Sequence, residues 1–171
     1  FALQRVSMRQ VIEGLHAAGT IDQLKRVGED IRRLTQNLLA QGVGAEPLTR
    51  TITALNDALS RRAIELVLER HDLEGIDWCW LALGSEGRGE QLLKTDQDNA
   101  LVLADGLGWP DAPQAMAAFH EQLAAMGYPP CPGGVMASNP QWRRSQSGWL
   151  ERIEAWLARP DADAVMNLAI L

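Results

Sequence analysis

The hydrophobic period of the chain changes near Gly75, and this change limits the possible folds more than any other feature. Before Gly75, apolar residues recur every three or four positions, which is the period of amphipathic helices. After it, short apolar runs at 78–83 and 99–104 are typical of strands, and the first has the pattern of a strand covered on both faces. We therefore expect an α/β (α+β) fold in which an N-terminal helical lobe at 1–74 packs on a small mixed-sheet domain at 75–171.

Three helices are expected in the lobe. A short helix ends near Gly19, a second follows Thr20 as its capping residue, and a third begins near Pro47. The inward apolar residues are Val6, Val11, Ile12 and Leu15 in the first, Ile21, Leu24, Val27, Ile31, Leu34 and Leu38 in the second, and Leu48, Ile52, Leu55, Leu59, Ala63 and Leu66 in the third.

The C-terminal half alternates helices with connections rich in proline and glycine. An amphipathic helix through Met116 and Met126 precedes an irregular segment at 128–134, because Pro removes backbone donors and Gly frees the backbone. Val135 and Met136 are expected to form a brief third strand.

Two further elements close the chain. Ser147 is expected to cap a helix that Pro160 ends, and 161–171 is interpreted as another helix, with a strand at 165–171 as the alternative. The inward residues of the helix after Ser147 are expected to be Leu150, Ile153, Trp156 and Leu157.

Composition excludes several classes of protein. The chain has 171 residues and a net charge of −6, which does not suit a broad nucleic-acid or anionic-membrane surface. No apolar run approaches the roughly 20 residues that span a bilayer, so a cytoplasmic protein is expected. Cys79 and Cys131 are far apart and the histidines are scattered, which predicts neither a disulfide framework nor a zinc site. Because the chain begins at Phe1 without Met, we expect a piece of a longer protein, truncated at its C-terminus.

Residues at the end of the first strand have the chemistry of a phosphate site. Gly84 and Ser85 follow the strand directly, where backbone N–H groups and a hydroxyl can approach a phosphate. Arg88 or Lys94 is then expected to neutralise the charge of a leaving pyrophosphate.

Two acids precede the second strand. Asp96 and Asp98 are two residues apart, so at the mouth of a strand their carboxylates point to the same side. Such a pair suits Mg²⁺ or Mn²⁺ in phosphoryl chemistry. Taken alone, the run 96–99 (Asp-Gln-Asp-Asn) is better explained by a polar turn. The preceding Gly84-Ser85 pair favours the metal site.

Other nucleotide and metal motifs do not fit these residues. Gly84 and Gly89 have the spacing of a P-loop, but Glu90 and Gln91 occupy its Lys and Ser/Thr positions. The glycine spacing also fails the dinucleotide fingerprint, and an EF-hand loop starting at Asp96 lacks most of its ligands.

Taken together, Gly84-Ser85, Asp96-x-Asp98 and the apolar strand that follows resemble the polymerase-β-like nucleotidyltransferase superfamily. More closely, the runs 84–90 (Gly-Ser-Glu-Gly-Arg-Gly-Glu), 95–101 (Thr-Asp-Gln-Asp-Asn-Ala-Leu) and 131–140 (Cys-Pro-Gly-Gly-Val-Met-Ala-Ser-Asn-Pro) resemble the bacterial signal-transduction nucleotidyltransferases. That resemblance implies CBS or cyclic-nucleotide-binding domains as neighbours, and a likeness to the uridylyltransferase that modifies the nitrogen-regulatory signalling protein.

The resemblance also implies roles for the motif residues. Gly84 and Ser85 would hold the phosphates of an NTP, and Asp96 and Asp98 would bind the metal and act in catalysis, together with Arg88. The expected reaction transfers a nucleoside monophosphate from the NTP to a protein or small-molecule acceptor and releases pyrophosphate.

One departure from the superfamily keeps alternatives open. Its members commonly use a third carboxylate on a later strand, and the later acids here fall in expected loops or helices: Asp105, Asp111, Glu151 and Glu154. A non-catalytic nucleotide sensor is therefore one alternative, and a helical interaction or homodimerisation module is another. The segment 133–134, with Arg143 and Arg144, is either a cover over the substrate or a connector beside a solvated basic pair.

Overall fold

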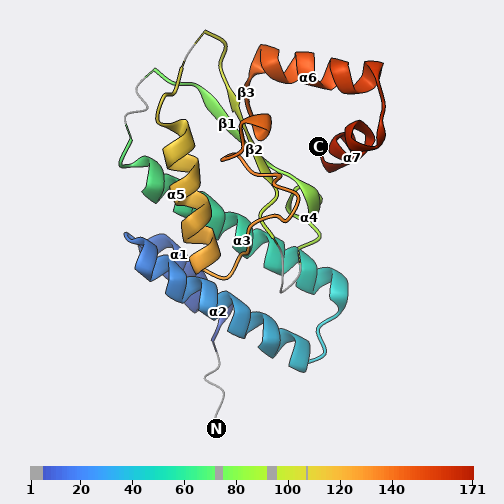
Figure 1. Cartoon of the computed structure of the whole chain (residues 1–171). Coiled ribbons are helices and arrows are strands. Elements are labelled where there is room, and N and C mark those ends of the chain that lie inside the picture. Colours follow the sequence, from blue (N-terminus) through green and yellow to red (C-terminus); the bar gives the residue numbers. More distant parts are fainter. Residues whose placement is uncertain (1–5, 72–74, 92–95, 107) are drawn as a thin grey trace.

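A computed structural model describes residues 6–71, 75–91, 96–106 and 108–171. It confirms the α/β fold: helices pack around a small three-stranded mixed sheet (Figure 1). Within the described residues the elements are α1 (Met8–Ala17), α2 (Ile21–Ala40), α3 (Ala45–Leu68), β1 (Trp78–Ala82), α4 (Gly84–Gly87), β2 (Asn99–Leu103), α5 (Ala112–Ala125), a 3₁₀ turn (Pro140–Trp142), β3 (Arg143–Ser145), α6 (Gln146–Ala158) and α7 (Ala162–Ile170).

The three expected N-terminal helices are present. Thr20 caps α2 as predicted, its Oγ1 accepting from the backbone N of Gln23 at 3.3 Å. Ser7 caps α1 in the same way and exchanges hydrogen bonds with Gln10. The inward placement of Ile12 was wrong: its side chain is 43% exposed, because α1 buries only the line through Val11 and Leu15.

The sheet has the order β1-β2-β3, with β1 antiparallel and β3 parallel to β2. The expected third strand at Val135 and Met136 was wrong. Val135 accepts one backbone hydrogen bond from Asn99, and the chain then turns away, since the N of Met136 bonds to the carbonyl of Gly134. The third strand is β3 instead, and its polar sequence gave no strand signal.

Strand β1 lies at an edge of the sheet. Trp78 and Trp80 pack on the main core and Leu81, on the opposite face, packs on a second cluster, so both faces are covered in part, as predicted, while Cys79 and Ala82 are exposed. The antiparallel register sets Trp80 opposite Leu101.

The main core runs across the expected domain boundary. It joins apolar residues of α1, α2 and α3 to α5 and to Leu101 of β2, and Figure 1 shows α5 lying against the helical lobe. A second cluster, beneath α6 and α7, contains Leu83, Ala100, Val135, Trp142, Trp149, Trp156 and Ala164. The division at residue 74 remains a prediction.

The two C-terminal helices are present, with different caps and faces. Ser145, not Ser147, caps α6, while the N and Oγ of Ser147 bind Oδ1 of Asp105 at 2.9 and 2.7 Å. Leu150 and Leu157 are 58% and 64% exposed, so their inward placement was wrong. Each follows a buried tryptophan by one residue, which turns it about 100° around the helix.

None of the described helices combines the length and apolar character needed to cross a membrane.

Candidate active site

Pairing between β1 and β2 brings the two sequence motifs together. Ala82 lies opposite Asn99 in the antiparallel register, and the backbone N of Leu83 donates to the carbonyl O of Asp98 at 3.0 Å. The residue after β1 therefore lies beside the residue before β2, so Gly84 and Asp98 are neighbours in space.

Gly84 fits this position because it has no side chain. Its φ is +55°, and a Cβ there would lie 2.2 Å from Oδ2 of Asp98. The expected Gly-Ser turn is a one-turn helix, α4, closed by hydrogen bonds from Gly87 N to Leu83 O and from Arg88 N to Gly84 O. Only glycine leaves the Asp98 carboxylate room in this arrangement.

Asp96 and Asp98 come together with a residue that the sequence analysis did not place in the site. Oxygen atoms of both acids and Sγ of Cys131 all lie within 4.8 Å of one another. Backbone contacts bring Cys131 in, because Gln97 forms a parallel bridge with Pro130. The sequence signal was the Cys-Pro-Gly-Gly run, which had been noted for its resemblance only.

The thiol of Cys131 acts on Asp98 as a hydrogen-bond donor. Burial is the main cause that raises the pKa of Cys131, and the Asp98 carboxylate raises it further, so at neutral pH the group is a protonated thiol. Burial also raises the pKa of Asp98, helped by the charge of Asp96 and opposed by the Cys131 hydrogen bond and by Arg88. The thiol therefore positions the Asp98 carboxylate.

A second group of acids lies on the other side of Asp98. Glu86 of α4 and Asp57 of α3 are hydrogen-bonded through their carboxyl groups, which requires a proton on one of them. Burial, followed by the charges of Asp57 and Asp98, raises the pKa of Glu86 to about 7. Burial likewise raises the pKa of Asp57, against the nearby Arg61. The helical lobe thus contributes an acid to the surroundings of the site.

The sequence analysis missed both of these acids. Glu86 lies inside the Gly-Ser motif but was not assigned a role, and Asp57 lies on a helix where one acid among many gives no local signal. Their contact depends on how α3 packs beside β1.

Among the described residues, the strand that runs parallel to β2 carries no carboxylate. Within the described residues that strand is β3, Arg143–Ser145. Nη1 of Arg143 donates to the carbonyls of Ala137 and Ser138 at 2.7 and 3.1 Å, and Nε of Arg144 donates to Gln141 O at 3.0 Å. Both guanidinium groups therefore brace the loop before β3.

The other predicted site residues are Arg88 and Ser85, which the structure describes, and Lys94, which it does not. Arg88 lies near enough to lower the pKa of Asp98, while its Nε binds Oε2 of Glu90 at 2.9 Å on the surface. Ser85 is half-buried on α4. Lys94 lies outside the described residues.

A buried network fixes the start of β2. Oδ1 of Asn99 accepts from Ala137 N at 2.8 Å and from Nε2 of His120 at 2.9 Å. Because the backbone N can only donate, the facing Asn99 atom is its oxygen, so His120 carries its proton on Nε2 and Nδ1 accepts from Ser138 Oγ at 3.0 Å. Burial lowers the pKa of His120 to about 4, which keeps the ring neutral.

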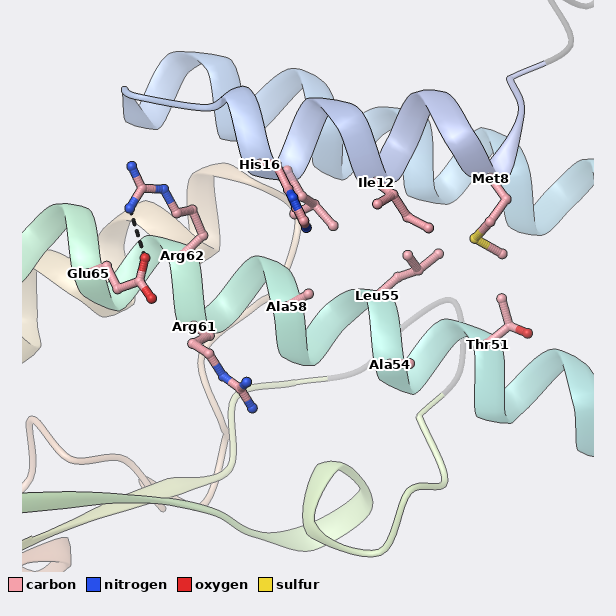
Figure 2. Close-up of a pocket in the computed structure, with 11 residues that line it drawn as sticks. Met8, Ile12, His16, Thr51, Ala54, Leu55, Ala58, Arg61, Arg62 and Glu65 are labelled. Carbon is pink, nitrogen blue, oxygen red and sulfur yellow. Dashed lines mark hydrogen bonds and ion pairs between the residues drawn. The ribbon is translucent and has the colours of Figure 1, made fainter.

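A large hollow between helices of the lobe lies away from these acids. It has a volume of about 810 Å³ and runs between α1 and α3, with apolar walls that include Met8, Ile12 and Leu55 (Figure 2). None of the metal-site residues lines it, so we place the candidate active site at the end of β1 and not in the helical lobe.

Comparison with known proteins agrees with this location. The family model described as "Putative nucleotidyltransferase DUF294" matches residues 29–163, which is most of the chain. The chain belongs to this family. The matched region begins within α2 and includes the Gly-Ser helix, both aspartates and Cys131. Nucleotidyl transfer is thus the general reaction class, with an NTP as substrate. No curated protein and no solved structure matched the chain.

The donor atoms at the site fit a divalent cation. Nucleotidyltransferases typically use such ions, and Asp96 and Asp98 supply the hard oxygen ligands that they prefer. The absence of a Cβ at Gly84 keeps one face of the Asp98 carboxylate open.

Proposed function

We propose that this chain transfers a nucleoside monophosphate from an NTP to a hydroxyl group of a protein or small-molecule acceptor. The convergence of Gly84, Asp96 and Asp98 on one point at the end of β1 supports this proposal most directly. The acceptor oxygen forms a bond with the α-phosphorus, the bond from that phosphorus to the bridging oxygen breaks, and pyrophosphate leaves with the electron pair. The hydroxyl proton passes to solvent.

In this proposal each residue acts on charge or position. Asp96 and Asp98 hold Mg²⁺ or Mn²⁺, and a cation bound there would supply charge neutralisation for the phosphates. Gly84 and Ser85 leave room for the phosphates beside α4. Arg88, near Asp98, offers a cation to the leaving pyrophosphate, a role we also propose for Lys94.

The biological setting is part of the proposal. We place the chain in bacterial signal transduction, as the catalytic unit beside CBS or cyclic-nucleotide-binding domains. Those neighbours would control transfer through the helical lobe, which shares a large core with α5. Movement of the lobe would displace Asp57 relative to Glu86 beside the site.

Pyrophosphate release tests the proposal. The full-length protein is incubated with each common NTP and with Mg²⁺ or Mn²⁺, and pyrophosphate is measured in the wild type, in Asp98→Asn and in Asp111→Asn. Asp111 is a suitable control because it is exposed and makes no side-chain cap bond at the start of α5. We expect release by the wild type and the control, and a loss of at least about 100-fold in Asp98→Asn, the scale of one lost electrostatic contact.

A non-catalytic nucleotide sensor is the second candidate, favoured by the absence of an acid from β3. NTP binding by the wild type without pyrophosphate release under any of these conditions would contradict transfer and support the sensor.

A further inference from the structure

A separate hollow lies between α3 and the face of β1 that carries its tryptophans. It has a volume of about 390 Å³, within the range of roughly 300–1,000 Å³ that small-molecule sites occupy. Its walls include Asp57, Arg61, Glu65, Trp78, Trp80 and Glu86. The nucleotidyl-transfer mechanism above uses none of these residues as a binding group.

The walls contain flat aromatic surface held in a fixed orientation. Trp78 and Trp80 project from the same face of β1 and are both half-buried. Trp80 packs edge-on against Phe119 with ring centroids 4.9 Å apart, which fixes the plane of its indole. Ala82, the next residue on that face, is small and leaves the space open.

The polar groups at the other wall supply both donors and acceptors. The Asp57 and Glu86 carboxyl groups are hydrogen-bonded to each other and still present oxygen acceptors. Oδ1 of Asp57 is buried and accepts no hydrogen bond from the described residues. Arg61, one turn after Asp57 on α3, presents N–H donors. In Figure 2 its side chain leaves α3 on the side away from α1.

The balance of charge selects the kind of group that fits. A phosphate would meet Asp57 and Glu86, whose charges would repel it. An organic cation would meet the guanidinium of Arg61, and the Glu65 carboxylate is already paired with Arg62 at 2.8 Å. A neutral, flat group with its own donors and acceptors satisfies both walls, and a nucleobase has these properties.

The hollow also lies next to the candidate metal site. A smaller hollow of about 10 Å³ shares Ser60, Trp80 and Glu86 with it and reaches Asp96. Glu86 lies within electrostatic reach of Asp98 as well. The hollow between α3 and β1 and the metal site are therefore adjacent.

We propose that the hollow between α3 and β1 binds the base of the NTP, with the indoles of Trp78 and Trp80 as its stacking surface and with Asp57, Arg61 and Glu86 contacting its edge. The proposal rests on the proposed function, because it assumes that the phosphates lie at Asp96 and Asp98. It makes the helical lobe part of the substrate site.

Calorimetry on the full chain with Mg²⁺ can separate the base from the phosphates. The probes are inorganic triphosphate and the α,β-methylene analogues of ATP and UTP. In these analogues the bond that breaks in the proposed reaction cannot be cleaved. Trp78→Leu removes a stacking surface worth about 1–3 kcal/mol per base, so the affinity for at least one analogue should fall by about 5- to 150-fold. The affinity for inorganic triphosphate should not change.

A second variant avoids any effect of Trp78→Leu on folding. Arg61→Gln changes an exposed residue of α3 and should weaken analogue binding several-fold, whereas Arg50→Gln, exposed on the same helix and paired with Glu46, should not. Unchanged analogue affinity in both Trp78→Leu and Arg61→Gln, with triphosphate still bound, would overturn the proposed base site and leave the transfer reaction intact. Binding of neither triphosphate nor analogues by the wild type would overturn the proposed function itself.

Discussion

Replacing Glu86 by Gln tests the carboxyl pair between the helical lobe and the site. Gln can still hydrogen-bond to Asp57 but cannot ionise. In the wild type the pKa of Glu86 is raised from its usual 4.5 to about 7 by burial and by the charges of Asp57 and Asp98. This rise means that the ionised form costs the folded state about 3 kcal/mol, since each pKa unit is worth about 1.4 kcal/mol.

The sign follows from the proton count. Below pH 4.5 the carboxyl is protonated in both states and has no effect on the pH dependence. Between pH 4.5 and 7 the unfolded chain has lost the proton while the folded chain keeps it, so the free energy of unfolding falls as pH rises. Above pH 7 the carboxyl is ionised in both states, and the free energy of unfolding falls no further on its account. Between pH 4.5 and pH 8.5, the free energy of unfolding of Glu86→Gln should therefore rise relative to that of the wild type by up to about 3 kcal/mol.

Urea unfolding of both proteins from pH 4.5 to 8.5, with a chelator present, measures this difference. Subtracting the two curves cancels the titrating groups that do not interact with Glu86. Asp57 and Asp98, whose charges act on Glu86, titrate together with it. Glu121→Gln, at an exposed residue of α5, is the matched control. A flat difference curve for Glu86→Gln would refute the buried carboxyl pair. Added Mg²⁺ should reduce the effect, because a cation at Asp98 favours the ionised form.

Two further predictions concern the residues around Asp98 and the start of β2. Gly84→Ala introduces a Cβ at 2.2 Å from Oδ2 of Asp98 and should abolish nucleotidyl transfer. The control is Gly89→Ala, where φ is +68° and no atom lies within 4 Å of the new Cβ, so unfolding experiments should show only the left-handed backbone cost of about 1–2 kcal/mol. Equal transfer activity in the two variants would contradict the steric argument. Burial lowers the pKa of His120 to about 4, so as pH drops from 6.5 to 4 the unfolded chain gains a proton that the folded chain does not, and the free energy of unfolding should fall. His120→Gln should remove that fall, even though it loses part of the Asn99 network. Urea midpoints that decline in parallel in both proteins would show that another group is responsible.

Features that depend on local sequence were predicted well. The helices α2 and α3 follow from single apolar stripes, and the Thr20 cap follows from a hydroxyl at the residue before the first turn. Where two lines of apolar residues lie side by side, as with Trp156 and Leu157, the sequence did not show which line is buried. Burial of one line depends on the neighbour that covers it.

The candidate site was predicted in part, for a similar reason. Gly84 and Asp98 flank two strands that are consecutive in the chain, so pairing of those strands alone brings them together. Cys131 arrives from a proline-rich loop, and its contact with Asp98 depends on the backbone pairing of Gln97 with Pro130. No rule of spacing relates these residues.

By itself, then, the sequence determined the helices, the two apolar strands and the pair of motifs at their facing ends, because each depends on residues close together in the chain. Tertiary structure decided which strand completes the sheet, since Arg143–Ser145 pairs with β2 without an apolar pattern of its own. It also decided the contact between Asp57 and Glu86 and the hollow beside Trp78. These features arise where α3 faces β1 across that hollow, and the burial that shifts the carboxyl pKa values exists only once the tertiary structure has formed.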